Sequence, residues 1–283
     1  MVRRSEPGVS GPRIEFATAQ VTLYAHDIEE SLRFYRDLLG FAETFRTPKQ
    51  GVPAHIELQL GSLRLGVATF DTLNRHHGIP TGRGPPRVEL ALFTDDVDGA
   101  YGWASSNGAP ALRPPRDFGG YLRNAIMADP DGNPIVFTTR LPVTTTADPT
   151  RRPRFRNHLY NILTSNVEES LRFYRDLLGS TETFRTPKQG PPDHVEMELG
   201  PLNLAVSTLE ALTRDHGLSG GGGPPRGELV LWVRDVDGAL AGLNARGSPT
   251  LSPPHPFAGN LRGAWVTDPD GNPVQLVARP GGG

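Results

Sequence analysis

The segment EESLRFYRDLLGFAETFRTPKQG, residues 29–51, occurs a second time as EESLRFYRDLLGSTETFRTPKQG at residues 168–190. The two segments are identical at 21 of 23 positions and lie 139 residues apart. The same offset relates GPPR at 84–87 to GPPR at 223–226, and DPDGNP at 129–134 to DPDGNP at 268–273. A repeat of this length is too long for a solenoid unit and long enough to have its own core. The sequence therefore predicts one unit used twice.

The two units are expected at residues 16–140 and 155–280, which together take up most of a chain of 283 residues. Two domains of about 140 residues each also fit the usual size of a single core. Between the units, LPVTTTADPTRRPR at 141–154 is rich in Pro and Thr and shows no apolar period. We therefore predict that this segment is a linker.

The first half of each unit combines strands with one helix. In the first unit, residues 20–25 and 56–69 have strand patterns, and residues 28–40 have apolar residues at helical spacing. Asp27, followed by a glutamate three residues later, predicts the helix start, and Gly40 predicts its end.

The second half of the unit repeats the theme. Residues 88–93 read as a strand and 97–107 as a helix, and two further strands at 125–128 and 134–137 flank the Asp-Pro-Asp-Gly-Asn turn. Each unit therefore contains two modules, and the chain contains four. This pattern predicts an α+β fold in which helices cover one face of curled, mixed sheets.

Composition excludes several classes of function. Lys and Arg total 29 against 31 Asp and Glu, a net charge of −2, which lacks the basic excess typical of nucleic-acid binding. The absence of cysteine removes thiolate metal sites and thiol nucleophiles. The N-terminus has basic residues but no apolar core of a signal peptide, and no run of about 18 apolar residues occurs. We expect a cytoplasmic protein with no nucleic-acid or membrane partner.

The order of these motifs resembles the vicinal oxygen chelate superfamily, which includes glyoxalase I, bleomycin-resistance proteins, fosfomycin-resistance enzymes and extradiol dioxygenases. The motifs are a strand followed by EESLRFYRDLLG, a central strand running into Asp-Val-Asp-Gly-Ala, and DPDGNP before a last apolar strand. The resemblance covers both units almost end to end. It implies tandem domains built of four βαβββ modules, whose sheets curl into cups, in a monomeric pseudo-dimer or a homodimer. Fold alone does not imply the reaction.

The resemblance also implies positions for metal ligands. They fall on Gln20, Arg64, Glu89 and Val136 in the first unit, and on Leu159, Asn203, Glu228 and Gln275 in the second. Neither set contains two histidines and a carboxylate, which argues against an iron-dependent extradiol dioxygenase. If the first module of one unit met the last module of the other, Gln20, Glu228 and Gln275 would converge. We expect no transition metal; a divalent ion (Mg, Mn, Ni, Zn or Fe), if bound, would use Gln20, Glu89, Glu228 and Gln275.

Glu89 and Glu228 are the candidate catalytic residues, because each lies on a strand that is otherwise apolar on both faces. A carboxylate there must be paired, bound to a ligand, or raised in pKa. If the protein is an enzyme, one of these glutamates would act as a general base. The alternative is a structural ion pair with Arg87, Arg226 or Arg64.

The other candidate residues are expected to bind a small organic ligand. The strand at 55–60 and its counterpart at 194–199 alternate polar and apolar residues, so one face looks either into the cup or into solvent. The candidate ligand-binding residues are Gln20, His55, Glu57, Arg64, Phe93, His194, Glu196, Trp232 and Gln275. His77 and His216 each precede a glycine in a polar loop and are expected to face solvent.

Two functions remain open at this level. The first is a metal-free binding protein, similar to the antibiotic-binding resistance proteins of the family, that holds a small molecule by shape, aromatic contact and a few charges. The second is a glyoxalase-like lyase, isomerase or epimerase that uses a cup glutamate as its base, with or without a divalent metal. The first unit, with Gln20, keeps more of the glyoxalase pattern.

Overall fold

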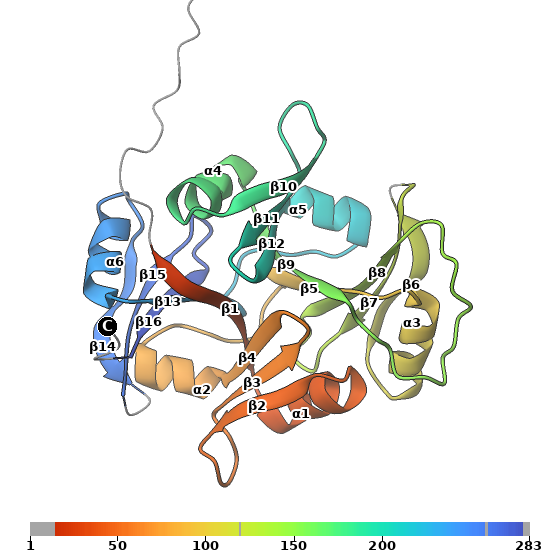
Figure 1. Ribbon diagram of the computed structural model, residues 1–283, viewed down its shortest axis with the longest axis horizontal. Helices are drawn as coiled ribbons and strands as arrows, with labels where there is room; N and C mark the ends of the chain where they lie inside the picture. The colour runs from red at the N-terminus through yellow and green to blue at the C-terminus, as the bar shows by residue number, and fades with distance from the viewer. Residues whose placement is uncertain (1–14, 119, 258–259, 280–283) are drawn as a thin grey trace, which may run out of the picture.

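The computed structural model describes residues 15–118, 120–257 and 260–279. The first 14 residues, which include most of the segment considered above as a signal peptide, lie outside the described part. Four modules follow one another along the chain, as predicted (Figure 1). The first unit contains β1 (Phe16–Ala25), α1 (Ile28–Leu32), η1 (Arg33–Leu38), β2 (Ala42–Thr47), β3 (His55–Leu60), β4 (Leu63–Thr69), α2 (Phe70–Thr72), η2 (Leu73–His77), β5 (Val88–Phe93), α3 (Val97–Ser106), β6 (Ala111–Phe118), β7 (Leu122–Ala128) and β8 (Pro134–Arg140).

The second unit repeats this order after the 141–154 segment. It contains β9 (Asn157–Thr164), α4 (Val167–Leu171), η3 (Arg172–Leu177), β10 (Thr181–Thr186), β11 (His194–Leu199), β12 (Leu202–Thr208), α5 (Leu209–Ala211), η4 (Leu212–His216), β13 (Gly227–Val233), α6 (Val236–Asn244), β14 (Thr250–Phe257), β15 (Leu261–Thr267) and β16 (Pro273–Ala278). The predicted unit boundaries stay a prediction.

The strands form two sheets of eight, and each sheet takes one module from each unit. Sheet A has the order β14-β15-β16-β13-β1-β4-β3-β2, and sheet B the order β10-β11-β12-β9-β5-β8-β7-β6. The first module of one unit therefore shares a sheet with the last module of the other. In Figure 1 the two sheets lie side by side, with the red β1 beside the blue β13 and β5 beside the green β9.

An antiparallel strand pair joins the two modules within each sheet. In sheet A, Thr22 of β1 pairs with Glu228 of β13, and in sheet B, Asn161 of β9 pairs with Glu89 of β5. These two junctions are related by the 139-residue offset. They place the two candidate carboxylates at equivalent positions in the two sheets. Each curled sheet with its covering loops is called a cup below.

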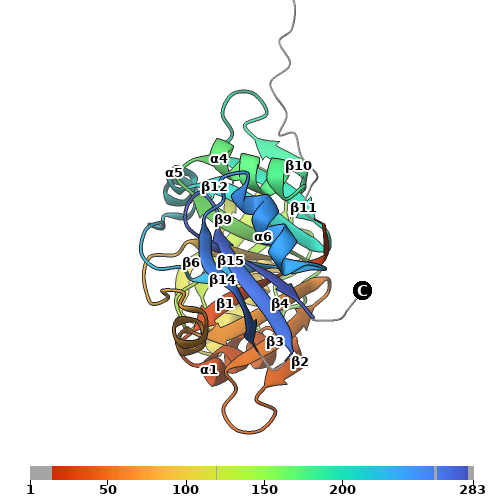
Figure 2. The same cartoon turned by 90° about the vertical axis from the view of Figure 1, so that its left-hand side faces the viewer.

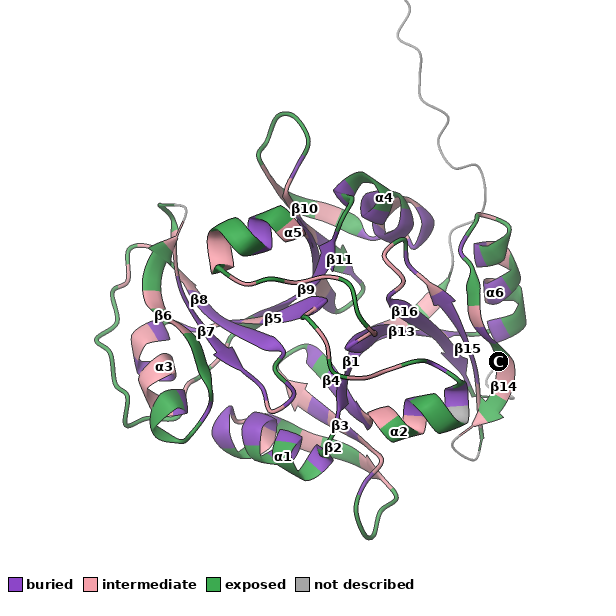
Figure 3. Cartoon of the chain, turned by 180° about the vertical axis from the view of Figure 1, so that it is seen from behind, coloured by how far each residue is buried: buried purple, intermediate pink, exposed green. Residues whose placement is uncertain are grey.

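Helices cover the outer faces of the sheets. Figure 2 shows α6 lying over β14 and β15, and Figure 3 shows buried central strands with helices exposed on their outer sides. A single large core of buried apolar residues includes members of all four modules. Among the described residues, no helix is long and apolar enough to cross a membrane.

The predicted helix at 28–40 begins where expected but changes form. The Asp27 carboxylate accepts hydrogen bonds from the backbone of Glu29 and Glu30, at 2.8 and 3.3 Å, which confirms the N-cap. After Leu32 the helix widens into the π-helix η1, in which Phe34, Tyr35 and Leu38 are all buried. The same transition occurs between α4 and η3, so it belongs to the repeated sequence.

The repeated DPDGNP and GPPR motifs join the two units structurally. The Asp129 carboxylate accepts hydrogen bonds from the backbone of Asp131 and Asn133, which makes the segment a turn, as predicted. Arg226 of the other GPPR motif is 2% exposed and donates to the carbonyls of Gly84 and Asp131.

Arg87 repeats the arrangement in the opposite direction. It donates to Asn272 Oδ1 at 2.9 Å, to the Gly223 carbonyl at 2.9 Å and to the Asp270 carbonyl. Each GPPR arginine therefore contacts the turn of the other unit. The sequence also allowed an ion pair of either arginine with Glu89 or Glu228. In the structure, both guanidinium groups donate instead to backbone carbonyls, and that of Arg87 also donates to Asn272.

Candidate functional site

A cavity of about 1000 Å³ lies in the cup of sheet B. Its wall combines apolar and aromatic side chains with a set of charged ones. The residues that matter below are Glu89, Phe93, Phe118, Tyr121, Asn161, Phe184, His194, Glu196, Ser207 and His216. They come from β5, β6, β9, β10, β11, β12 and η4, and from the turn after β6, so both units contribute to the site.

The carboxylate of Glu89 lies in the wall of this cavity, and both its oxygens have hydrogen-bond partners. Asn161 Nδ2 donates to Oε2 at 2.9 Å, and His216 Nδ1 lies 2.6 Å from Oε1. Burial by itself would lower the pKa of His216, but the charge and hydrogen bond of Glu89 outweigh it and the pKa is raised. The contact with Glu89 therefore favours the imidazolium form of His216.

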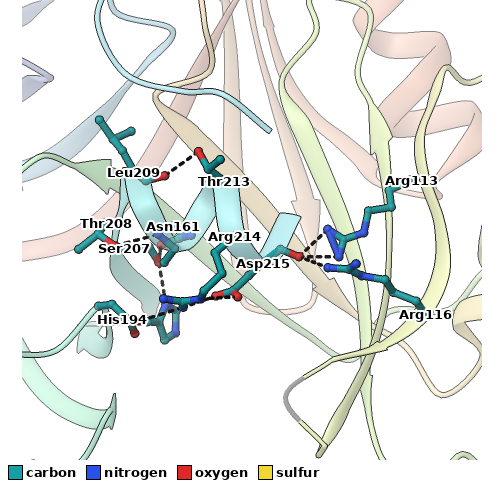
Figure 4. A network of polar contacts seen from close by, with 12 residues as sticks. Arg113, Arg116, Asn161, His194, Ser207, Thr208, Leu209, Thr213, Arg214 and Asp215 are labelled. Atoms are coloured by element: carbon teal, nitrogen blue, oxygen red, sulfur yellow. Dashed lines mark hydrogen bonds and ion pairs between the residues drawn. The ribbon is translucent and has the colours of Figure 1, made fainter. Parts of the chain in front are cut away.

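The prediction that His77 and His216 face solvent is wrong. The His216 side chain is 16% exposed, and His77 is 8% exposed. The sequence showed the polar loop around His216 but not that the helical turn η4 folds back over β5. Arg113 and Arg116 of β6 donate to the carbonyl of Asp215, which fixes the end of η4 beside the cavity (Figure 4).

A row of hydrogen-bonded polar side chains extends from Glu89 across sheet B. Ser207 Oγ donates to Asn161 Oδ1 at 2.8 Å, and His194 Nδ1 lies 2.7 Å from Ser207 Oγ. His194 Nε2 is then 3.5 Å from Glu196 Oε1. Figure 4 shows Asn161, Ser207 and His194 grouped below the α5 turn. The row crosses four neighbouring strands, β5, β9, β12 and β11.

The equivalent cup of sheet A is filled by its own aromatic residues. Oε2 of Glu228 accepts hydrogen bonds from Tyr24 Oη at 3.1 Å and from Trp265 Nε1 at 2.7 Å, and both aromatic side chains are fully buried. His255 stacks on Trp265 with ring centroids 5.4 Å apart, and His77 lies on it at 4.4 Å. Burial raises the pKa of Glu228 to about 7, although its two donors favour the charged form.

The candidate site residues divide between the two cups. Glu89, Phe93, His194 and Glu196 line the sheet-B cavity. Gln20, His55, Glu57, Arg64, Glu228, Trp232 and Gln275 belong to sheet A. Gln20 and Gln275 lie in register with Val230, on strands either side of β13. His194 and Glu196 of β11 line the cavity. In sheet A, burial lowers the pKa of His55, the counterpart of His194, to about 4.

Two of the four implied ligand positions in sheet B cannot bind a metal. In sheet B, the implied positions Leu159 and Val136 carry apolar side chains, and Asn203 donates instead to Asn157. In sheet A, Oε2 of Glu228 accepts two hydrogen bonds, and among the described residues the buried Gln20 Oε1 has no hydrogen-bond partner. In the described ranges, no group of three His, Asp or Glu side chains is placed to hold a metal ion. Ligand identity and count are the test of a proposed metal site.

Sequence reasoning missed Asn161, Ser207 and His216 as parts of the site. Their counterparts Thr22, Ala68 and His77 differ in two of the three positions, and this difference between otherwise similar units was the available signal. Ser207, a polar side chain whose counterpart in the other repeat is the apolar Ala68, points to a site used in only one cup.

The family model for the glyoxalase/bleomycin resistance protein/dioxygenase superfamily matches residues 17–137 and again 156–276. The chain belongs to this superfamily. Both units are members, so the resemblance given by the motifs is confirmed. None of the curated proteins matches the sequence significantly.

Solved structures of superfamily members show the same fold. Glyoxalase I from Zea mays is 17% identical, with 92% of each chain covered and a TM-score of 0.60. A mutant of that protein gives 20% identity, 92% coverage of each chain and a TM-score of 0.61. A putative dioxygenase from Bacillus subtilis is 13% identical, covering 96% of this chain and 87% of that one, with a TM-score of 0.58. At these identities the likeness extends to the fold alone.

Proposed function

We propose that this superfamily member binds a small organic molecule in the cup of sheet B, without a transition metal. The observation that carries the proposal is the cavity of about 1000 Å³, which has the size of a drug-binding site. Phe93, Phe118, Tyr121 and Phe184 line it together with a few convergent polar groups. Aromatic walls contribute large contact areas for a flat ligand.

The state of Glu89 favours binding over general-base catalysis. Both oxygens of Glu89 have short hydrogen bonds, to Asn161 and to His216, and a carboxylate stabilised in this way is a weaker base toward a substrate proton. An ion pair of this kind holds the two side chains in place in the cavity wall. This supports the antibiotic-binding type of function within the superfamily, in a cytoplasmic protein.

A glyoxalase-like lyase, isomerase or epimerase is the second candidate. What favours it is that Glu89 and His216 form a carboxylate and imidazole pair in the cavity wall, an arrangement that can move a proton at a substrate carbon. In that case Glu89 would act through His216. The closed environment of Glu228 supports no such role in sheet A.

The test of the binding proposal uses N-phenyl-1-naphthylamine, a neutral dye whose emission rises in apolar cavities. Phe184, which lines the cavity, and Phe45, its counterpart in sheet A, are 36% and 46% exposed and lie in identical local sequence. We expect the dye to bind one site per chain. F184A should weaken binding at least fivefold and F45A less than twofold.

Equal effects of F184A and F45A, or no dye binding, would count against a ligand site in sheet B. Elemental analysis of the purified chain tests the metal-free part of the proposal, and a stoichiometric divalent metal would contradict it. For the second candidate, E89Q should abolish turnover of a substrate, whereas in a binding protein it only weakens affinity.

A further inference from the structure

Two acceptor atoms in the sheet-B cavity lie close together without a short hydrogen bond between them. His194 Nε2 and Glu196 Oε1 are 3.5 Å apart, beyond the usual 2.7–3.2 Å range. Both side chains line the cavity, with 22% and 35% of their surfaces exposed. Among the described residues, the carboxylate of Glu196 has no other ion-pair or hydrogen-bond partner. A ligand group that reached this point would meet both atoms.

The hydrogen-bonded row decides which nitrogen of His194 is the acceptor. An ionised carboxylate only accepts hydrogen bonds, so Asn161 must turn its NH₂ group to Glu89 and its oxygen to Ser207. The single Ser207 proton is then given to Asn161. His194 Nδ1 must therefore donate to Ser207, so that in the neutral tautomer the lone pair is on Nε2, beside Glu196.

This direction of the row also rules out Ser207 as a nucleophile activated by His194. In such a pair the hydroxyl donates its proton to the imidazole. Here the hydroxyl donates to Asn161 and receives from His194. The row therefore orients His194 as an acceptor instead of activating a serine.

We propose that the ligand of the sheet-B cup presents a protonated amine, which is bound between His194 Nε2 and Glu196 Oε1. The inference rests on the proposed binding function and names the ligand class: an organic amine with a flat or aromatic body. An ammonium group supplies several N–H donors and a positive charge, and the pair supplies two acceptors and a negative charge.

The surroundings of the pair agree with a cationic group. Asp193 and Asp215 also line the cavity, where Arg214 binds both. Burial raises the pKa of Tyr121, and the carboxylates of Glu196, Asp215 and Asp193 raise it further. The same carboxylates would interact favourably with a bound cation beside Tyr121. The exposed ring of Tyr121 can lie against the body of the ligand.

Sheet A supplies a matched control within the same chain. Its counterparts of His194 and Glu196 are His55 and Glu57, but Thr22 and Ala68 replace Asn161 and Ser207. An alanine cannot continue the row, so sheet A has no equivalent means of fixing its histidine.

The test uses three dansyl sulfonamides on a five-carbon chain that ends in an amine, a hydroxyl or a carboxylate. Their emission in the full-length protein gives the dissociation constants at pH 7.5. We expect the amine probe to bind at least tenfold more tightly than the carboxylate probe. E196Q should weaken the amine probe about tenfold and the hydroxyl probe less than twofold, and E57Q should change neither.

The variants S207A and N161T copy the residues of sheet A and test the row itself. Each should weaken the amine probe threefold or more, with less than a twofold effect on the hydroxyl probe. If all three probes bind equally and E196Q has no effect, the amine inference is overturned while the binding function stands. If none of the probes binds, the amine inference and the binding function both fail.

Discussion

The indole nitrogen of Trp265 donates a 2.7 Å hydrogen bond to Oε2 of Glu228, and the ring covers a carboxylate whose counterpart in sheet B lines an open cavity. The residue at the Trp265 position in the other unit is Ile126. An indole fills space that the smaller side chain leaves. The two cups thus have the same strands and glutamates, but aromatic residues close one of them.

The buried Glu228 predicts a specific dependence of stability on pH. Its folded pKa is about 7 against an ordinary 4.5, so its contribution is present below pH 4.5 and is lost as the pH rises through 7. In E228Q the amide oxygen still accepts from Tyr24 and Trp265 without a charge. We expect E228Q to exceed the wild type in free energy of unfolding at pH 8 by up to about 3 kcal/mol. Urea unfolding at pH 5 and pH 8 checks this, and an equal difference at both pH values would contradict it.

His216 predicts a dependence of the same sign in sheet B. Because its pKa is raised in the folded state, the stability it contributes is present below the unfolded pKa and is lost as the pH rises through the raised value. We expect H216Q to cost about 2–4 kcal/mol at pH 6, since Glu89 loses its charged partner. The loss should be smaller at pH 9. The double variant E89Q/H216Q should recover part of the cost, and simple additivity of the two changes would show that the residues are not coupled.

Arg87 and Arg226, the arginines of the two GPPR motifs, are expected to contribute equally to the free energy of unfolding. Arg87 and Arg226 each donate to buried or half-buried carbonyls of the other unit, so removing either leaves acceptors without a donor. We expect R87M and R226M each to lower the free energy of unfolding by about 2–4 kcal/mol. R64M, at an exposed position of β4, should change it by less than about 0.5 kcal/mol. Thermal unfolding of the three variants gives the comparison, and a loss in only one arginine variant would refute an equal role.

The local features of the fold could be predicted because they depend on neighbouring residues. The Asp27 cap and the DPDGNP turn follow from side chains within four positions of the backbone groups that they bind. The offset of 139 residues then gave the four modules. These signals are short-range, and because each recurs in both units, chance does not account for them.

The site needed contacts that the sequence does not encode locally. Glu89 and His216 are 127 residues apart, and they meet only because each sheet combines modules of both units. Because both units have the same apolar pattern, pairing within a unit and pairing between units are equally compatible with it. Similarly, the sequence favoured Gln20 and the first unit, whereas the cavity of about 1000 Å³ is lined by strands of both units in sheet B, away from Gln20.

The exchange of modules predicts the assembly state of one unit expressed alone. In the full chain, β1 pairs with β13 of the other unit, and β5 pairs with β9. A fragment of residues 15–147 contains β1 and β5 but lacks their partner strands β13 and β9. In the module arrangement of the full chain, these two exposed strand edges would be paired by β5 and β1 of a second copy. We expect this fragment to be a homodimer by light scattering, with a melting temperature that rises with concentration. The full-length chain, whose paired edges are all internal, should melt independently of concentration. A folded fragment monomer with a concentration-independent melting temperature would show that β1 and β5 pair within one unit.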